Sequence, residues 1–150
     1  MPKCRVTLIA NCGVMIECNG AKVFSDAFHR KKTVNFSTVN EQRQLHMIKS
    51  PEFRNADAMI FTHKHADHSG ELKSFPNAKI YVNADEVAAD ELKGLGNLVQ
   101  VAFTDGAYYN FPACQKIRDG IYYIKAKGHT NGNSIVIVEL DGLFYMIHGD

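Results

Sequence analysis

Short apolar runs separated by turn-forming residues recur along the chain and have the length of β-strands. They lie at residues 6–10, 14–18, 21–25, 58–62, 78–82, 98–103, 108–111, 121–125, 135–140 and 143–147. Asn19-Gly20 and Asp141-Gly142 each stand between two such runs, and both pairs are typical of tight hairpin turns because they tolerate positive φ. The pattern therefore predicts sheets with hairpins near both ends of the chain.

Helices are predicted in three of the intervening segments, at residues 41–49, 69–75 and 84–92. Pro51 ends the first, Ser69 is a candidate N-cap of the second, and Gly94 breaks the third. The polar stretch 29–40 is long enough to be a functional loop. Strands that alternate with helices in the middle of the chain indicate a mixed α/β (α+β) layer structure.

The composition argues against several classes of function. At 150 residues the chain has the length of one domain that can bury a real core. Its formal charge of +1 provides no electrostatic footprint for nucleic acid or for an anionic membrane. No apolar run approaches the ~20 residues that span a bilayer, and the first residues lack the apolar core of a signal peptide. We therefore expect a cytoplasmic protein.

The four cysteines, Cys4, Cys12, Cys18 and Cys114, show no C-x-x-C spacing. Cys4 and Cys18 fall in strand-like stretches and are interpreted as small buried hydrophobic residues. Cys12 falls in a predicted turn and is a candidate for exposure. The spacing supports no metal-binding or catalytic role for any of the four.

The densest chemistry in the sequence is His63-Lys64-His65-Ala66-Asp67-His68, which follows a buried-strand pattern at 58–61. Neutral imidazole and carboxylate are ligands that zinc and similar divalent metals prefer. His63 and His65, two residues apart, point the same way in an extended backbone, and Asp67 and His68 can then serve a neighbouring position. An arbitrary histidine is more often a surface or core residue than a ligand. The clustering of imidazole and carboxylate nevertheless predicts a metal site, with donors for parts of two ions.

Two later segments offer further ligands. His129 lies between Gly128 and Thr130 in a predicted loop, where its small neighbours leave it free to reach inward. Asp150 follows the apolar run 143–147, and burial of a carboxylate is costly unless a cation compensates it. Each is ambiguous alone, because a loop histidine and a terminal acid are also ordinary surface residues.

Three segments, in their order along the chain, resemble the metallo-β-lactamase superfamily. They are H-x-H-x-D-H at 63–68, G-H-T at 128–130 and a strand ending in G-D at 149–150. The opening N-C-G-V-M-I-E at 11–17 and V-F-S-D at 23–26 resemble it too. The resemblance covers nearly the whole chain. It implies an αββα sandwich made of two similar halves.

The resemblance also implies a binuclear metal site. The implied ligands are His63, His65 and His129 for the first metal, Asp67 and His68 for the second, and Asp150 as the bridge. The expected cofactor is Zn²⁺, one or two per chain, with Fe or Mn as alternatives. The nucleophile would be a hydroxide between metals about 3.5–4 Å apart, and Asp67 would double as the catalytic proton acceptor and donor. Asp26 and Thr62 would either orient ligands or be ordinary polar residues at strand ends.

The chain departs from the family's pattern in several places. Residues 1–150 would form a single metallo-β-lactamase-like domain that is truncated at its C-terminal end, since the last histidine ligand of the second metal is missing. The second metal position would then be weak or empty. A half-finished sandwich would expose apolar sheet surface and allow a homo-oligomer. Asn131 replaces a proline common among relatives, and His148 is interpreted as a packing residue.

The leading functional interpretation is a metal-dependent hydrolase that uses a metal-bound hydroxide on an ester, thioester, lactone or phosphodiester bond of a small molecule. The glyoxalase II-like or lactonase-like branch of the family fits best. True β-lactamase activity is disfavoured because binuclear lactamases typically lack either the counterpart of His68 or that of Asp150.

Three alternatives remain open from the sequence. The first is a non-catalytic remnant that binds one metal or none. The second is a nuclease of the same fold, although the sequence contains no basic patch. The third is a diiron oxidoreductase; these resemble H-x-E-x-D, and here His65 replaces the glutamate.

Overall fold

The structure is a computed structural model that describes residues 4–10, 12–26 and 40–150. Its elements in chain order are β1 (Arg5–Ala10), β2 (Gly13–Cys18), β3 (Ala21–Ser25), α1 (Glu41–Ile48), α2 (Pro51–Arg54), β4 (Ala58–Phe61), α3 (Ala66–Ser69), η1 (Leu72–Ser74), β5 (Lys79–Asn83), η2 (Ala84–Glu86), η3 (Asp90–Leu92), β6 (Leu98–Val101), β7 (Cys114–Arg118), β8 (Ile121–Lys125), β9 (Ser134–Leu140) and β10 (Leu143–Ile147). The α labels are α-helices and the η labels are 3₁₀ turns.

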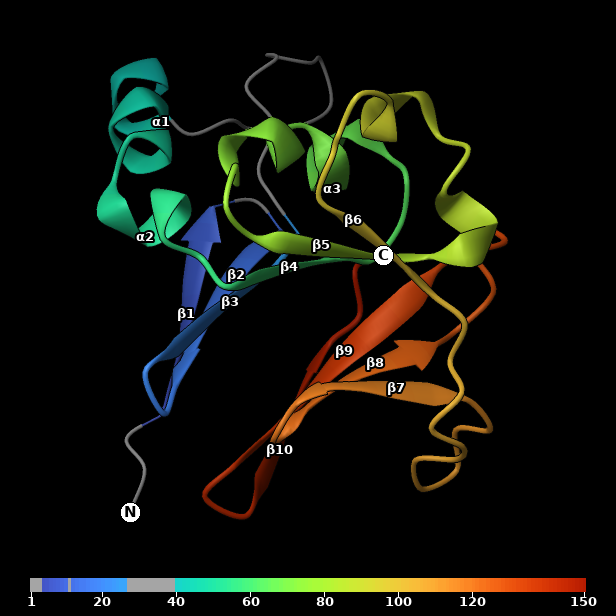
Figure 1. The fold of residues 1–150 in the computed structure, drawn as a ribbon. Helices are drawn as coiled ribbons and strands as arrows, with labels where there is room; N and C mark the ends of the chain where they lie inside the picture. Colours follow the sequence, from blue (N-terminus) through green and yellow to red (C-terminus); the bar gives the residue numbers. More distant parts are fainter. Residues whose placement is uncertain (1–3, 11, 27–39) are drawn as a thin grey trace.

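The described strands form two sheets that pack face to face. One has the order β1-β2-β3-β4-β5-β6 and the other β10-β9-β8-β7. The helices and 3₁₀ turns cover the outer face of the six-stranded sheet, while the four-stranded sheet lies against its inner face (Figure 1). The result is three layers in the order helix, sheet, sheet.

The six-stranded sheet changes from antiparallel to parallel along its width. β1, β2 and β3 pair antiparallel, and Asn19 and Gly20 make the β2–β3 turn with φ of 52° and 79°. From β3 to β6 the pairing is parallel. The carboxyl ends of these four strands therefore meet at one edge, which is where ligands bind in open α/β sheets. Asp26, His63 and Glu86 all follow shortly after those strand ends.

Two apolar layers hold the sandwich together. The helix-side layer joins Phe24, Met59 and Phe61 of the sheet to Phe53 and Phe75, with the Phe24–Phe75 ring centroids 4.8 Å apart. The sheet–sheet layer consists of Ile16, Val23, Ala58, Ile60, Val101, Phe103, Ile121, Tyr123, Val136 and Val138. Because β4 is buried on both faces, its continuous apolar run is what a parallel central strand requires.

Most predicted strands and both hairpin turns are observed. Two observed elements, α2 and β7, were not predicted, and three predicted segments have a different structure. Residues 84–92 form two 3₁₀ turns and no continuous helix, because Asn83 caps the first turn through Asp85 N and Glu86 turns into the interior. Ser69 is the last residue of α3 and does not cap a helix to Phe75. Residues 108–111 make only an isolated bridge.

The cysteine interpretation also needs correction. Cys4 and Cys18 form a disulfide and are half-buried, so they are not small buried hydrophobic residues. Cys12 is half-buried and Cys114 is buried, and both are free. His148 is exposed, which contradicts its interpretation as a packing residue. The predicted loop at 29–40 lies outside the described residues except for Asn40, whose side chain caps α1.

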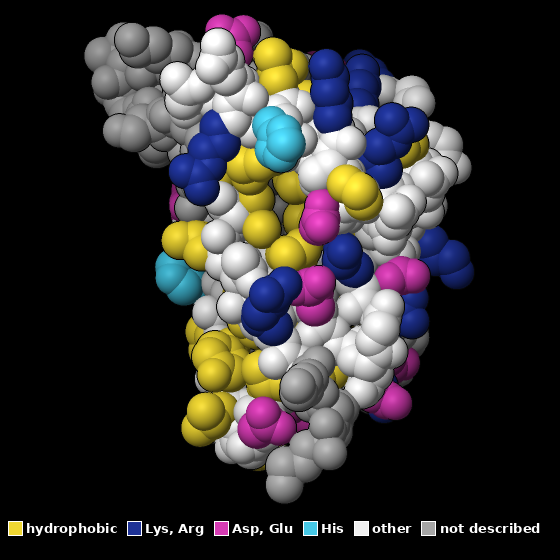
Figure 2. Space-filling model, turned by 90° about the vertical axis from the view of Figure 1, so that its left-hand side faces the viewer, with side chains coloured by type: hydrophobic (Ala, Val, Ile, Leu, Met, Phe, Trp, Pro, Cys, Tyr) yellow, Lys and Arg dark blue, Asp and Glu magenta, His cyan; other side chains and the backbone are white. Residues whose placement is uncertain are grey.

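Strand β10 leaves apolar side chains exposed at the edge of the four-stranded sheet, namely Leu143, Phe144, Tyr145 and Met146. Figure 2 views the molecule from the side of β1 and α1, where basic and acidic side chains are interspersed and hydrophobic side chains gather in groups between them. The mixed charge on that face agrees with the formal charge of +1. None of the helices in the described part of the chain is long and apolar enough to cross a membrane.

Candidate metal centre

The end of β4 delivers the H-x-H-x-D-H segment to the sheet edge. β4 is fully buried, and Thr62 and His63 continue it into the interior with no exposed surface. The backbone is still extended at His65, with φ −66° and ψ 146°, and α3 begins at the next residue. This change from extended to helical backbone turns Asp67 and His68 toward a position beside that of His63 and His65.

The first group of potential ligands is His63, His65, His129 and Asp150, whose ligand atoms all lie within 4.8 Å of one another. Nε2 of His129 lies 2.8 Å from Nδ1 of His65. Oδ2 of Asp150 lies 3.5 Å from Nε2 of His129 and 3.9 Å from Nε2 of His63. Three imidazoles and one carboxylate thus converge on one point.

The second group is Asp67, His68 and Cys12, again with ligand atoms within 4.8 Å of one another. Nε2 of His68 lies 3.6 Å from Oδ2 of Asp67 and 3.3 Å from Oδ1 of Asp150. The two oxygens of Asp150 therefore face different groups, because Oδ2 is directed at the first and Oδ1 at the second.

Asp26 anchors both buried histidines from the end of β3. Its carboxylate accepts hydrogen bonds from Thr62 N at 2.8 Å and from Thr62 Oγ1 at 2.7 Å, and it lies 2.8 Å from His68 Nδ1. Because Thr62 donates its hydroxyl proton to Asp26, its oxygen is free to accept from Nδ1 of His63, 3.2 Å away. Both rings are thereby oriented with Nε2 toward the centre, the direction that a metal ligand needs.

Buried polar contacts fix the loop that carries His129. Oε1 of Glu86 accepts from Thr130 Oγ1 at 2.5 Å and from Gly132 N at 2.9 Å, and Asn83 Nδ2 donates to Gly132 O at 2.9 Å. A Cβ at Gly132 would lie 2.2 Å from Cγ of Glu86, so only glycine allows this approach. The turn after β5 thus supports the His129 loop.

Gly149 brings Asp150 to the centre after β10. Its φ is +69°, and a Cβ at this position would lie 2.8 Å from Thr62 Oγ1 and 3.4 Å from His63 Nδ1. The backbone passes directly over two of the buried polar residues of the site. Any side chain here would push Asp150 away from the histidines.

Comparisons with known proteins rest on structure. No protein-family model matches the sequence, and no curated protein matches it. A probable metal-dependent hydrolase from Staphylococcus aureus matches with a TM-score of 0.67 and 20% identity, over 92% of this chain and 57% of the other. The dizinc quorum-quenching lactonase AidC, in complex with a product, matches at 0.63 and 13%, over 89% and 54%. The hydrolase AbOPH, of the beta lactamase superfamily, matches at 0.62 and 16%, over 89% and 53%.

The chain has the metallo-β-lactamase fold. It spans little more than half the length of the solved structures it matches. The three observed layers are one helical layer and two sheets. The His and Asp clusters lie at the edge where the parallel strands end.

The donor atoms of the centre fit a metal cation. Nε2 of His63 and Nε2 of His68 are buried and have no hydrogen-bond partner among the described residues, which is costly unless a ligand satisfies them. Burial and the neighbouring histidines lower the pKa of His63 to about 4, so its imidazole stays neutral. Burial also acts to lower the pKa of His68, but the hydrogen bond to Asp26 and the nearby Cys12 sulfur raise it to about 10. The surroundings of His68 therefore favour positive charge, which a metal cation also provides.

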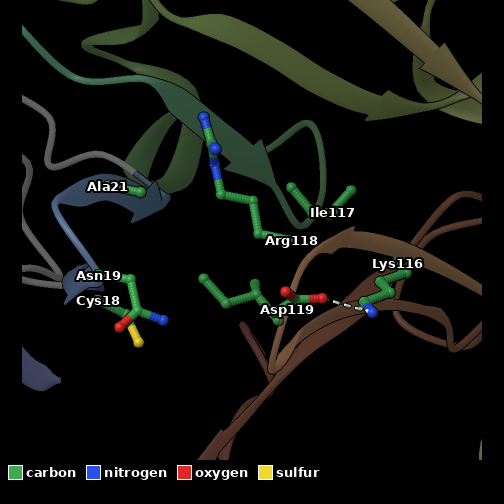
Figure 3. A pocket seen from close by; sticks show the side chains of 8 residues that line it. Cys18, Asn19, Ala21, Lys116, Ile117, Arg118 and Asp119 are labelled. Carbon is green, nitrogen blue, oxygen red and sulfur yellow. Dashed lines mark ion pairs between the residues drawn. The ribbon is translucent and has the colours of Figure 1, made fainter. Parts of the chain in front are cut away.

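Two of the cavities lie at opposite ends of the strands. A cavity of about 390 Å³ adjoins the centre, with Lys64, His65 and Ala66 on one wall and residues 88–91 on the other. A second, of about 430 Å³, lies between the β2–β3 and β7–β8 hairpins. Figure 3 shows its side chains, with Arg118 extending away from the Lys116–Asp119 ion pair. This far cavity is separate from the candidate ligands, whereas the first includes His65 in its lining.

All six ligands predicted from the sequence are brought together, but three contributors were missed. Cys12 was assigned no role, although the structure groups it with Asp67 and His68. The sequence predicts Asn83 just before the helix 84–92 and Glu86 in its first turn, and it indicates no role for either at the site. The buried carboxylate of Glu86 gave no signal in the sequence, because a glutamate in an Ala-rich segment is usually on the exposed side of a helix.

Proposed function

We propose that this chain is a metal-dependent hydrolase with two adjacent metal positions. The observation that carries the proposal is the orientation of Asp150. One of its oxygens faces His63 and His129 and the other faces His68, at 3.3 to 3.9 Å. A carboxylate placed in this way can bridge two cations, and two-metal hydrolases use such closely spaced ions.

Each metal position has its own set of proposed ligands. The first is formed by His63, His65 and His129, the second by Asp67 and His68, with Asp150 shared. Imidazole and carboxylate donors suit Zn²⁺, with Fe or Mn as alternatives. When bound, the metals would polarise the scissile bond and lower the pKa of the attacking water.

Asp67 is proposed as the residue that moves the proton. Its side chain is 16% exposed, so it reaches both the interior and the mouth of the site. One oxygen lies 3.6 Å from His68 Nε2. A carboxylate at this boundary can accept a proton from the nucleophile and pass it to a leaving group.

The substrate is proposed to be a small molecule with an ester, thioester, lactone or phosphodiester bond. The 390 Å³ cavity has the size of a small-molecule pocket and adjoins His65. Lys64 on its wall can interact with an anionic or carbonyl group. A lactone is favoured among these bonds because the matching structure AidC is a lactonase.

The test combines metal analysis with assays on one generic substrate of each bond type. The wild-type chain is expected to bind two metal ions and to hydrolyse at least one substrate. Asp150→Asn should lower kcat by at least about 100-fold, and the matched variant Asp119→Asn, on the surface at the far end, should not. Metal binding without turnover of any substrate would favour the non-catalytic remnant.

The location and the oligomeric state remain predictions. We propose a cytoplasmic location. Disulfides are rare in that compartment, so the Cys4–Cys18 disulfide makes this location a point to test. We also propose that the apolar edge strand β10 associates with a second copy of the chain, since an unpaired edge can accept another strand. Cell fractionation tests the first, and sedimentation of Phe144→Lys against the wild type tests the second.

A further inference from the structure

Cys12 lies in the turn between β1 and β2 and faces the second group of ligands. Its sulfur belongs with the carboxylate of Asp67 and the imidazole of His68 to a set whose ligand atoms lie within 4.8 Å of one another. It is half-buried and outside the Cys4–Cys18 disulfide. A thiol in this position is both close to the centre and chemically free.

The local backbone explains how a turn residue reaches the site. The β1–β2 register shifts between Leu8 and Ala10, and Gly13 follows the turn. A Cβ at Gly13 would lie 3.3 Å from Ala10 O and 3.7 Å from Asp26 O. A side chain would therefore crowd Ala10 O, while the turn lies in ordinary contact with the backbone of Asp26, the residue that orients His68.

His68 supplies independent evidence for a ligand at this position. Its side chain is fully buried, and its Nδ1 is occupied by Asp26 at 2.8 Å. Its Nε2 has no hydrogen-bond partner among the described residues. A buried nitrogen that faces a carboxylate and a thiol and makes a hydrogen bond to neither is the arrangement expected around a metal cation.

Counting donors shows what Cys12 would add. Asp67, His68 and the second oxygen of Asp150 provide three ligands, whereas zinc usually takes four. No other histidine in the described part of the chain joins this group. The sulfur of Cys12 is the remaining donor within reach, and thiolate is a strong ligand for zinc.

We infer that Cys12, as a thiolate, is the fourth ligand of the second metal position. The inference rests on the proposed two-metal function and deepens it, because it names the residue that completes the second site. A sulfur donor also makes that site selective: it should prefer zinc or cadmium to manganese, since soft ligands select soft metals.

The first test is spectroscopic and needs no enzyme activity. The full chain is loaded with two equivalents of Co²⁺ without oxygen, and its near-ultraviolet absorption is recorded. The wild type should show a sulfur-to-cobalt charge-transfer band that Cys12→Ser abolishes. The matched variant Cys114→Ser, which removes the other free cysteine, should keep it. A band that survives Cys12→Ser, or no band in a protein that binds two cobalt ions, would overturn the inference.

A second measurement separates ligation from folding. Cys12→Ser should keep the first metal and bind the second at least about tenfold more weakly, a loss of about 1.4 kcal/mol. Cys12→His should restore binding of two ions without the charge-transfer band, because imidazole replaces the thiolate. Equal affinity of the wild type and Cys12→Ser for the second zinc would contradict the inference while leaving the hydrolase proposal intact. A wild type that binds no metal at all would overturn both.

Discussion

Nδ1 of His68 lies 2.8 Å from Oδ2 of Asp26, and neither side chain is exposed to solvent. This contact joins the end of β3 to α3, two segments separated by 42 positions. The same carboxylate accepts two hydrogen bonds from Thr62. One buried acid therefore controls the orientation of both interior histidines, and the metal affinity of the centre should depend on it.

The Asp26→Asn variant should bind metal about 10–100-fold more weakly, as is usual when a partner that orients a histidine ligand is removed. An amide is nearly isosteric with the carboxylate, but it carries no charge and can present a donor to His68 Nδ1. Competition with a chromogenic chelator measures the change. Asp119→Asn is the control, and equal affinities of the two variants would contradict the role of Asp26.

Replacing Glu86 should affect mainly the first metal position. The Glu86→Gln variant keeps the volume but weakens the contacts to Thr130 and Gly132, so the loop of His129 should loosen. We expect the affinity for one of the two ions to fall about tenfold and the other to stay within about twofold. Calorimetric titration with zinc resolves the two steps. The exposed Glu91→Gln should leave both unchanged; a uniform loss in Glu86→Gln would argue for a general effect on folding.

Gly149→Ala should displace Asp150. Both Gly149 and Gly142 have positive φ, so alanine at either costs about 1 kcal/mol of unfolding free energy. Only at Gly149 does the new Cβ meet other atoms, at 2.8 Å from Thr62 Oγ1, while Gly142 is open. Gly149→Ala should therefore lower both metal stoichiometry and activity, whereas Gly142→Ala should lower thermal stability alone. Denaturation and metal analysis of the two variants make the comparison.

Removing the metal should destabilise the protein. A ligand that binds only the folded chain stabilises it by about 4 kcal/mol at a thousand times its Kd. The Tm in zinc should therefore exceed the Tm in a chelator by several degrees, and the difference should grow with zinc concentration. A Tm that does not respond to zinc would mean that the clustered histidines bind no metal in the folded state. His63→Ala is the matching variant, since loss of a ligand of the first position should reduce the response.

The fold was predictable where local sequence decides the structure. Asn19-Gly20 and Asp141-Gly142 specify their turns through positive φ at both positions, and both hairpins follow. The segment 84–92 was not predictable as two 3₁₀ turns, because the inward direction of Glu86 depends on a loop more than forty residues later. Helical composition was outweighed there by tertiary contacts.

The candidate site, like the fold, was predictable only where its residues are neighbours in the sequence. His63 to His68 form a cluster because they are adjacent in the sequence, so their chemistry is visible without a structure. Cys12 was missed because spacing cannot relate a residue to a partner 56 positions away. The Cys4–Cys18 bond follows from the β1–β2 register, in which Arg5 is opposite Glu17 and the next pair outward is Cys4 and Cys18. The sequence predicted the two strands but not this register.

The candidate ligands are divided between the two sheets, with His63 to His68 after β4 and with His129 and Asp150 after β8 and β10. A metal bound by both sets would act as a cross-link between the layers of the sandwich. Opening of the sheet–sheet interface would then require ligand release, so it would become a slow event coupled to metal exchange. The rate at which the protein exchanges its metal would thus report how often the two sheets separate.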